Sequence, residues 1–122
     1  MLHDDVTGSV LACAVTVHRA LGPGLREHSY QRAMELEMRA RGIAFSREPS
    51  LEIRYRGVLV GAHRPDFIVA DQVVLEIKAV HGLDAVFRAQ VVTYLRVSGL
   101  PVGLLVNFNV AVLKDGIRRF VL

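Results

Sequence analysis

The sequence has few of the residues that cross-link, anchor or target a small protein. Its 122 residues include a single cysteine, Cys13, which excludes an internal disulfide and cannot build a zinc site alone. No apolar run is long enough to span a membrane, and there is no repeat, glycine-rich phosphate loop or nucleophile elbow. The chain begins Met-Leu-His-Asp-Asp, acidic where a secretory signal is basic. We therefore expect one domain over residues 1–122, with no membrane anchor, in the cytoplasm.

Lysine is scarce as well, because 13 of the 15 basic residues are arginine. The net charge of +3 is compatible with a nucleic-acid partner, but the basic residues form no block. A general preference for arginine codons explains the charge equally well. With 52% hydrophobic and 22% charged residues the composition is that of a globular domain.

Hydrophobic periodicity and turn residues predict alternating helices and strands. Two helices are expected at residues 4–21 and 25–41, the second ended by Gly42. An antiparallel meander should follow, with strands at 51–55, 58–69 (irregular near 61–64) and 73–80.

The last part of the chain should contain one more helix and further strands. The helix is expected over residues 84–98, capped by Asp84 and closed by Gly99. A strand buried on both faces follows at 102–108, and a loosely alternating tail covers 110–113 and 117–121. The order ααβββαββ predicts an α/β fold with a central mixed sheet flanked by helices.

The most informative segment is Pro65-Asp66, nine further residues, and then Glu76-Ile77-Lys78. Glu76 and Lys78 are two apart on a strand, so both side chains leave the same face, and charged residues are costly to place inside an apolar strand. If residues 70–72 form a three-residue loop, Asp66 lies directly opposite Glu76. Two carboxylates this close repel unless a cation lies between them, and oxygen ligands favour Mg²⁺ or Mn²⁺.

Polar residues on two helices can complete such a site. Glu27 lies in register with the apolar stripe of Tyr30, Met34 and Met38, which predicts that it points inward at the first turn of its helix. Gln90 and Tyr94 are four apart on the third helix and share a face from which both can hydrogen-bond a phosphate. His63 and Arg64, just before Asp66, can bind phosphate or instead pair with the carboxylates.

These residues resemble the PD-(D/E)XK nuclease superfamily, and within it the small bacterial GxxExxY proteins. The motif that gives the group its name is Gly24-Leu25-Arg26-Glu27-His28-Ser29-Tyr30. The nuclease motif is Pro65-Asp66 with Glu76-Ile77-Lys78, and a third-helix feature of related nucleases is Gln90 followed by Tyr94. The resemblance runs from about Val6 to Val121 and implies a restriction-endonuclease-like core.

The resemblance also implies roles for the matched positions. Asp66, Glu76 and the main-chain carbonyl of Ile77 would hold one or two Mg²⁺ ions, and Glu27 would complete the metal site. Lys78 would orient or activate the attacking water and stabilise charge on the phosphate. The substrate-binding candidates are Gln90, Tyr94 and Arg64.

The function implied is metal-dependent hydrolysis of a nucleic acid, with DNA favoured over RNA. The alternative is a module on the same fold that binds nucleic acid, or assembles with other copies, without cleaving. The chain has no separate recognition domain, so substrate specificity would depend on a homo-oligomer or on a partner.

Overall fold

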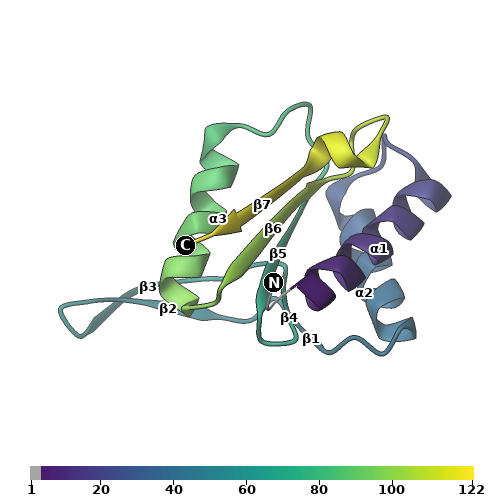
Figure 1. The fold of residues 1–122 in the computed structure, drawn as a ribbon. Coiled ribbons are helices and arrows are strands. Elements are labelled where there is room, and N and C mark those ends of the chain that lie inside the picture. Colours follow the sequence, from purple (N-terminus) through teal and green to yellow (C-terminus); the bar gives the residue numbers. More distant parts are fainter. Residues whose placement is uncertain (1–3) are drawn as a thin grey trace.

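The computed structural model describes residues 4–122 as an α/β fold. Its helices are α1 (Asp4–Leu21), α2 (Glu27–Ala40) and α3 (Ala85–Ser98). The strands are β1 (Phe45–Arg47), β2 (Leu51–Tyr55), β3 (Val58–His63), β4 (Phe67–Val69), β5 (Val73–Lys78), β6 (Val102–Asn107) and β7 (Ile117–Val121), with a short 3-10 helix, η1 (Leu113–Gly116), before β7. Helices α1 and α2 lie on one side of the main sheet and α3 on the other (Figure 1).

The main sheet has five strands in the order β1-β4-β5-β6-β7. Strands β5 and β6 run parallel and are connected through α3, while the other neighbouring pairs are antiparallel. Every residue of β6 is buried, because helices cover both faces of the sheet. This confirms the predicted α/β fold with a mixed central sheet flanked by helices. No helix of residues 4–122 is long and apolar enough to span a membrane.

The helices end where glycine was expected to end them. Gly42 and Gly99 both adopt left-handed backbone conformations, with φ of 70° and 72°. Helix α2 begins two residues later than predicted, because the N–H of Leu25 bonds to the Tyr30 hydroxyl (3.1 Å) rather than opening the helix. Helix α3 begins after Asp84, whose side chain makes no capping hydrogen bond.

The predicted three-stranded meander is wrong. Strands β2 and β3 form a separate two-stranded sheet, and the edge of the main sheet is occupied by β1, which the sequence analysis did not detect. The chain breaks between β3 and β4 at Arg64-Pro65-Asp66, where proline lacks the N–H needed for a continuous ladder. The tail likewise contains one strand, since residues 110–112 form bends and lead into η1.

The turn between β4 and β5 sets the register of the later site. Residues 70–72 form the three-residue connection that the sequence predicted, and Ala70 and Asp71 both have positive φ. The pairing Phe67 with Leu75 follows from it. Extending this register by one residue places Asp66 opposite Glu76, as predicted.

Two hydrophobic clusters hold the helices onto the sheet. The larger cluster joins α1 and α2 to the face that carries Leu75 and Ile77, and the smaller one joins α3 to the opposite face. Helix α3 approaches β6 closely because the sheet has a glycine beneath it. A Cβ atom on Gly103 would lie 2.5 Å from Cγ1 of Val91.

Candidate functional site

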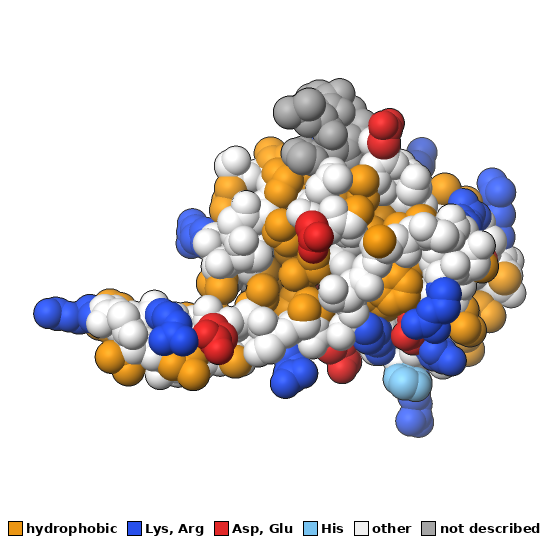
Figure 2. All heavy atoms as spheres, turned by 90° about the horizontal axis from the view of Figure 1, so that it is seen from below, with side chains coloured by type: hydrophobic (Ala, Val, Ile, Leu, Met, Phe, Trp, Pro, Cys, Tyr) orange, Lys and Arg blue, Asp and Glu red, His pale blue; other side chains and the backbone are white. Residues whose placement is uncertain are grey.

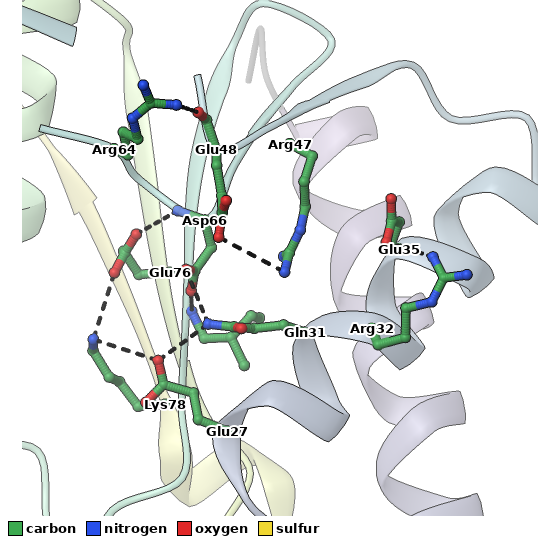
Figure 3. Close-up of polar contacts among 11 residues, drawn as sticks. Glu27, Gln31, Arg32, Glu35, Arg47, Glu48, Arg64, Asp66, Glu76 and Lys78 are labelled. Carbon is green, nitrogen blue, oxygen red and sulfur yellow. Dashed lines mark hydrogen bonds and ion pairs between the residues drawn. The ribbon is translucent and has the colours of Figure 1, made fainter. Parts of the chain in front are cut away.

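Asp66 and Glu76 form an interlocked pair just before the start of β4. The N–H of Asp66 donates to Oε1 of Glu76, and the N–H of Ile77 donates to Oδ2 of Asp66, both at 2.7 Å. The exposed fractions are only 9% for Asp66 and 4% for Glu76. Each carboxylate therefore takes the place of a main-chain acceptor at the point where β4 and β5 stop pairing (Figure 3).

Lys78 extends this pair along the same strand. Its Nζ lies 3.6 Å from Oε2 of Glu76 and 3.9 Å from Oε1 of Glu27, and its side chain is 14% exposed. The ammonium group also sits 5.1 Å from the centre of the Phe87 ring, at the start of α3. The lysine is thus held by groups from α2, β5 and α3.

Glu27 points inward, as predicted, from the first turn of α2. Its side chain is 38% exposed, so it is less buried than Asp66 and Glu76. The stripe of Tyr30, Met34 and Met38 is fully buried behind it, which confirms the predicted inner face of the helix.

Gln31 links the two acidic groups and was not identified from the sequence. Its Nε2 donates to Oε1 of Glu27 (3.1 Å) and to Oδ1 of Asp66 (3.0 Å). Figure 3 shows the amide between the two carboxylates. The position one turn after Glu27 is the only sequence signal for it, and a polar residue there is usually a surface residue. Phe87 was missed for a similar reason, because an aromatic residue in a first helical turn looks like part of a core.

Burial and mutual repulsion alter the protonation of the cluster. The pKa of Glu76 is raised to about 7, first by desolvation and then by the charge of Asp66. Burial also raises the pKa of Asp66, against the N–H of Ile77 and the charge of Lys78. The pKa of Glu27 is raised by burial as well, and Lys78 opposes the shift.

Tyr94 faces the same cluster from α3. Burial and the charges of Glu76 and Asp66 raise the pKa of Tyr94 to about 12, so its hydroxyl remains a hydrogen-bond donor. Its ring lies 6.4 Å from that of His63. Gln90 is half-buried one turn earlier on the same face of the helix.

Arg64 lies apart from the carboxylates. It is exposed, and its Nη1 approaches the main-chain oxygen of Glu48 at 3.5 Å (Figure 3). A second arginine, Arg47 on β1, lies nearer the carboxylates (Figure 3), and its charge opposes the rise in the pKa of Asp66. Within residues 4–122 its Nη1 is buried and has no hydrogen-bond partner.

The acidic pair fits one metal better than a larger cage. Among the described residues no group of three or more His, Cys, Asp or Glu side chains is gathered closely enough to hold an ion. The side chains of Asp66 and Glu76 converge, while Lys78 and Gln31 stand between this pair and Glu27. The Lys78 carbonyl accepts a hydrogen bond from the N–H of Phe108 on the β6 side of β5. Because successive carbonyls of a strand point to opposite edges, the Ile77 carbonyl points towards the other edge, where Asp66 lies. Two carboxylates and a carbonyl suit Mg²⁺, which keeps several water ligands.

A mixed α/β sheet that presents two carboxylates and a lysine between helices is consistent with a restriction-endonuclease-like protein. The chain belongs to the PD-(D/E)XK nuclease superfamily, because the family model of that description matches residues 4–120. Members are generally nucleases that use divalent metals, which makes a nucleic acid the implied class of substrate. No curated protein and no solved structure gave a significant match.

Proposed function

We propose that this protein is a Mg²⁺-dependent nuclease that hydrolyses phosphodiester bonds of DNA, or of RNA. The observation that carries the proposal is the interlocked pair of Asp66 and Glu76 with the amine of Lys78 beside it. Asp66 and Glu76 are 10 residues apart in sequence, and burying both carboxylates costs stability. Charged groups buried at such a cost are expected to serve a functional purpose. In a chain of this superfamily, that purpose is to hold a divalent cation.

Asp66, Glu76 and the Ile77 carbonyl would hold the cation, with Glu27 as a further ligand once Lys78 gives way. A bound Mg²⁺ supplies Lewis acidity, which acidifies the attacking water and offsets charge on the phosphate oxygens. Mn²⁺ suits the same oxygen ligands.

Lys78 orients the water and stabilises the charge that builds on the phosphate. The ring of Phe87 and the carboxylate of Glu27 fix its ammonium group from two sides, at 5.1 Å and 3.9 Å. Lys78 is one of only two lysines in the chain, against 13 arginines. Its ammonium is a compact point charge, unlike the planar guanidinium group.

Residues around the cluster would contact the substrate backbone. Tyr94 and Gln90 share a face of α3 that adjoins the carboxylates, and both can donate hydrogen bonds to phosphate oxygens. Arg64 would reach a phosphate further along the substrate strand, because it is exposed and lies in the same connection between β3 and β4 as Asp66.

We also infer that the chain belongs to the GxxExxY group within the superfamily. The motif has a clear structural use here. Gly24 has φ of 104°, which favours glycine, and Glu27 enters the site. The Tyr30 hydroxyl donates to the Gly22 carbonyl (2.5 Å), which closes the loop between α1 and α2.

The direct test measures cleavage of labelled plasmid, single-stranded DNA and RNA with Mg²⁺, Mn²⁺ or EDTA. Lys78→Met and Asp66→Asn are the test variants, since asparagine retains an acceptor for the N–H of Ile77. Lys114→Met is the matched control, because it removes the other lysine, which is exposed on η1. We expect each test variant to lose at least about 100-fold in kcat and the control to stay at the wild-type rate.

Cleavage that survives both test variants, or that EDTA does not stop, would contradict the proposal. Binding of nucleic acid without cleavage would favour the alternative, a non-catalytic module on the nuclease fold.

A further inference from the structure

A two-stranded arm projects from the body of the protein and has no role in the site described above. The arm comprises residues 51–63, that is β2, β3 and their turn, and it pairs with no strand of the main sheet. It extends well beyond the body in both views (Figures 1 and 2). Its inner end packs on α3 through Leu51, whereas every residue from 54 to 60 is exposed.

The outer part of the arm combines positive charge with apolar side chains, as Figure 2 shows. Arg54 and Arg56 are exposed there, and the only acidic residue within 51–63, Glu52, accepts a hydrogen bond from Arg54 at 2.9 Å, which leaves the arm with a net positive charge. Tyr55 and Val58 face each other across the strands and are 67% and 63% exposed.

The turn residue itself points to a purpose for the charge. Arg56 and Gly57 have φ of 51° and 79°, which is the pattern of a two-residue hairpin turn in which asparagine or aspartate normally precedes glycine. Arginine in this left-handed conformation costs roughly 1 kcal/mol. Asparagine or aspartate would adopt this conformation at a lower cost, but neither would place a positive charge at the tip of the arm.

We propose that this arm enters the major groove of double-stranded DNA and that Arg54 and Arg56 contact its phosphates. The inference rests on the proposed nuclease function and names double-stranded DNA as the substrate. Two strands about 5 Å apart fit a groove about 12 Å wide, and the exposed part is about 10 Å long against a groove depth of about 8.5 Å. The major groove of an RNA duplex is too narrow for such a ribbon.

The arm is also joined directly to the site. Strand β3 leads through Arg64-Pro65 to Asp66, and the ring of His63 at its base lies 6.4 Å from Tyr94. The extended chain from Arg56 to His63 places the tip on the order of 20 Å from Asp66. At about 3.4 Å per base pair, the arginines would contact DNA about six base pairs from the bond that is cut.

The test measures binding by fluorescence anisotropy in the Asp66→Asn background, in EDTA, so that no DNA is cut. The probes are a 20-bp DNA duplex, an RNA duplex and single-stranded DNA of the same sequence, each about 20 residues long. The arm variant is Arg54→Ser/Arg56→Ser. The matched control is Arg32→Ser/Arg39→Ser, which removes the same charge from two exposed arginines that pair with Glu35 on α2.

We expect the arm variant to bind the DNA duplex at least tenfold more weakly, with the slope of log K against log salt reduced by about two. The control should change neither quantity by as much, and binding to duplex RNA should not depend on the arm. Shortening the DNA to about six base pairs should remove the difference between wild type and the arm variant.

Other outcomes would overturn the inference. Equal losses in the arm variant and the control would show a general charge effect. If light scattering shows a dimer that Tyr55→Ser/Val58→Ser converts to a monomer, while the arm arginines leave DNA binding unchanged, a second copy covers the arm.

This binding experiment, taken together with the cleavage assay of the proposed function run on Arg54→Ser/Arg56→Ser in the otherwise wild-type chain, separates this inference from the proposed function. Arm-dependent binding without Mg²⁺-dependent cleavage would uphold the arm and reject the nuclease. Cleavage of duplex DNA that does not change when Arg54 and Arg56 are replaced would support the nuclease function and reject the proposed role of the arm.

Discussion

Individual side chains of the site are held by bonds that the sequence pattern does not reveal. The spacing of Glu76 and Lys78 predicts a shared face, and the three-residue loop predicts that Asp66 lies opposite Glu76. The link through Gln31 depends on how α2 packs against the strand that carries Asp66, which no local pattern encodes.

The raised pKa of Glu76 makes the stability of the metal-free protein depend on pH. A carboxyl with a pKa near 7 in the folded state and about 4.5 when unfolded binds more protons when folded, so stability falls as pH rises between these values. Glu76→Gln removes the part of this dependence that comes from Glu76, while Asp66 and Glu27, whose pKa values are also raised, still contribute. We expect the variant to gain on the order of 1–3 kcal/mol over wild type at pH 8 in EDTA, and little at pH 4.

Urea unfolding of both proteins at pH 4, 6 and 8 measures this difference. Glu52→Gln, at an exposed carboxylate on β2, is the control and should follow the wild-type curve. A stability gain for Glu76→Gln that is the same at every pH would contradict the explanation.

Helix α3 carries Gln90, Tyr94 and Phe87, so its distance from the sheet sets their positions. That distance depends on Gly103, where an added Cβ would meet Cγ1 of Val91. We expect Gly103→Ala to destabilise the protein by about 1–3 kcal/mol, because overpacking a dense core forces side chains or backbone to shift. Gly61→Ala, where nothing lies within 4 Å, should have a smaller effect.

A double-mutant cycle checks the cause. In a Val91→Ala background the clash is gone, so Gly103→Ala should cost less than it does in the wild type. Equal costs in both backgrounds, measured by denaturant unfolding, would place the strain elsewhere.

The elements were predictable to the extent that they are long or end in a strong stop signal. Helix α1 matches its predicted bounds, and Gly42 and Gly99 end the other helices as expected. Strand β1 has three residues, too few to show an alternating pattern. The predicted meander is wrong because the alternation in 51–55 indicates a strand with two different faces but does not identify its partner. Pro65 separates β2 and β3 from the main sheet.

In the protein as a whole, cation binding should be coupled to unfolding. The carboxylates of Asp66 and Glu76 are buried together, and a ligand that binds only the folded chain stabilises it. We expect saturating Mg²⁺ or Mn²⁺ to add about 1–3 kcal/mol and raise the Tm by several degrees. Asp66→Asn should lose this shift, whereas Lys78→Met should keep it although it does not cleave.

Thermal unfolding with increasing metal measures the effect, with NaCl of equal ionic strength as the control. A Tm shift that NaCl reproduces, or that Asp66→Asn retains, would show that the cation does not bind at Asp66 and Glu76.

The hydrogen bonds that Asp66 and Glu76 make with the main chain affect which substitutions in a homologue indicate a loss of activity. Asp66 and Glu76 clasp the ends of two strands, so losing either would leave a buried N–H without an acceptor, at a cost of about 1–3 kcal/mol. Selection for a folded sheet therefore preserves an acceptor at both positions, as a carboxylate or as the amide of Asn or Gln, even in a descendant that has stopped cutting nucleic acid. Among the described residues the ammonium of Lys78 meets only side chains, so the sheet does not need it. In a homologue, loss of the lysine, or an amide in place of either carboxylate, is the change that records that the chemistry has been abandoned.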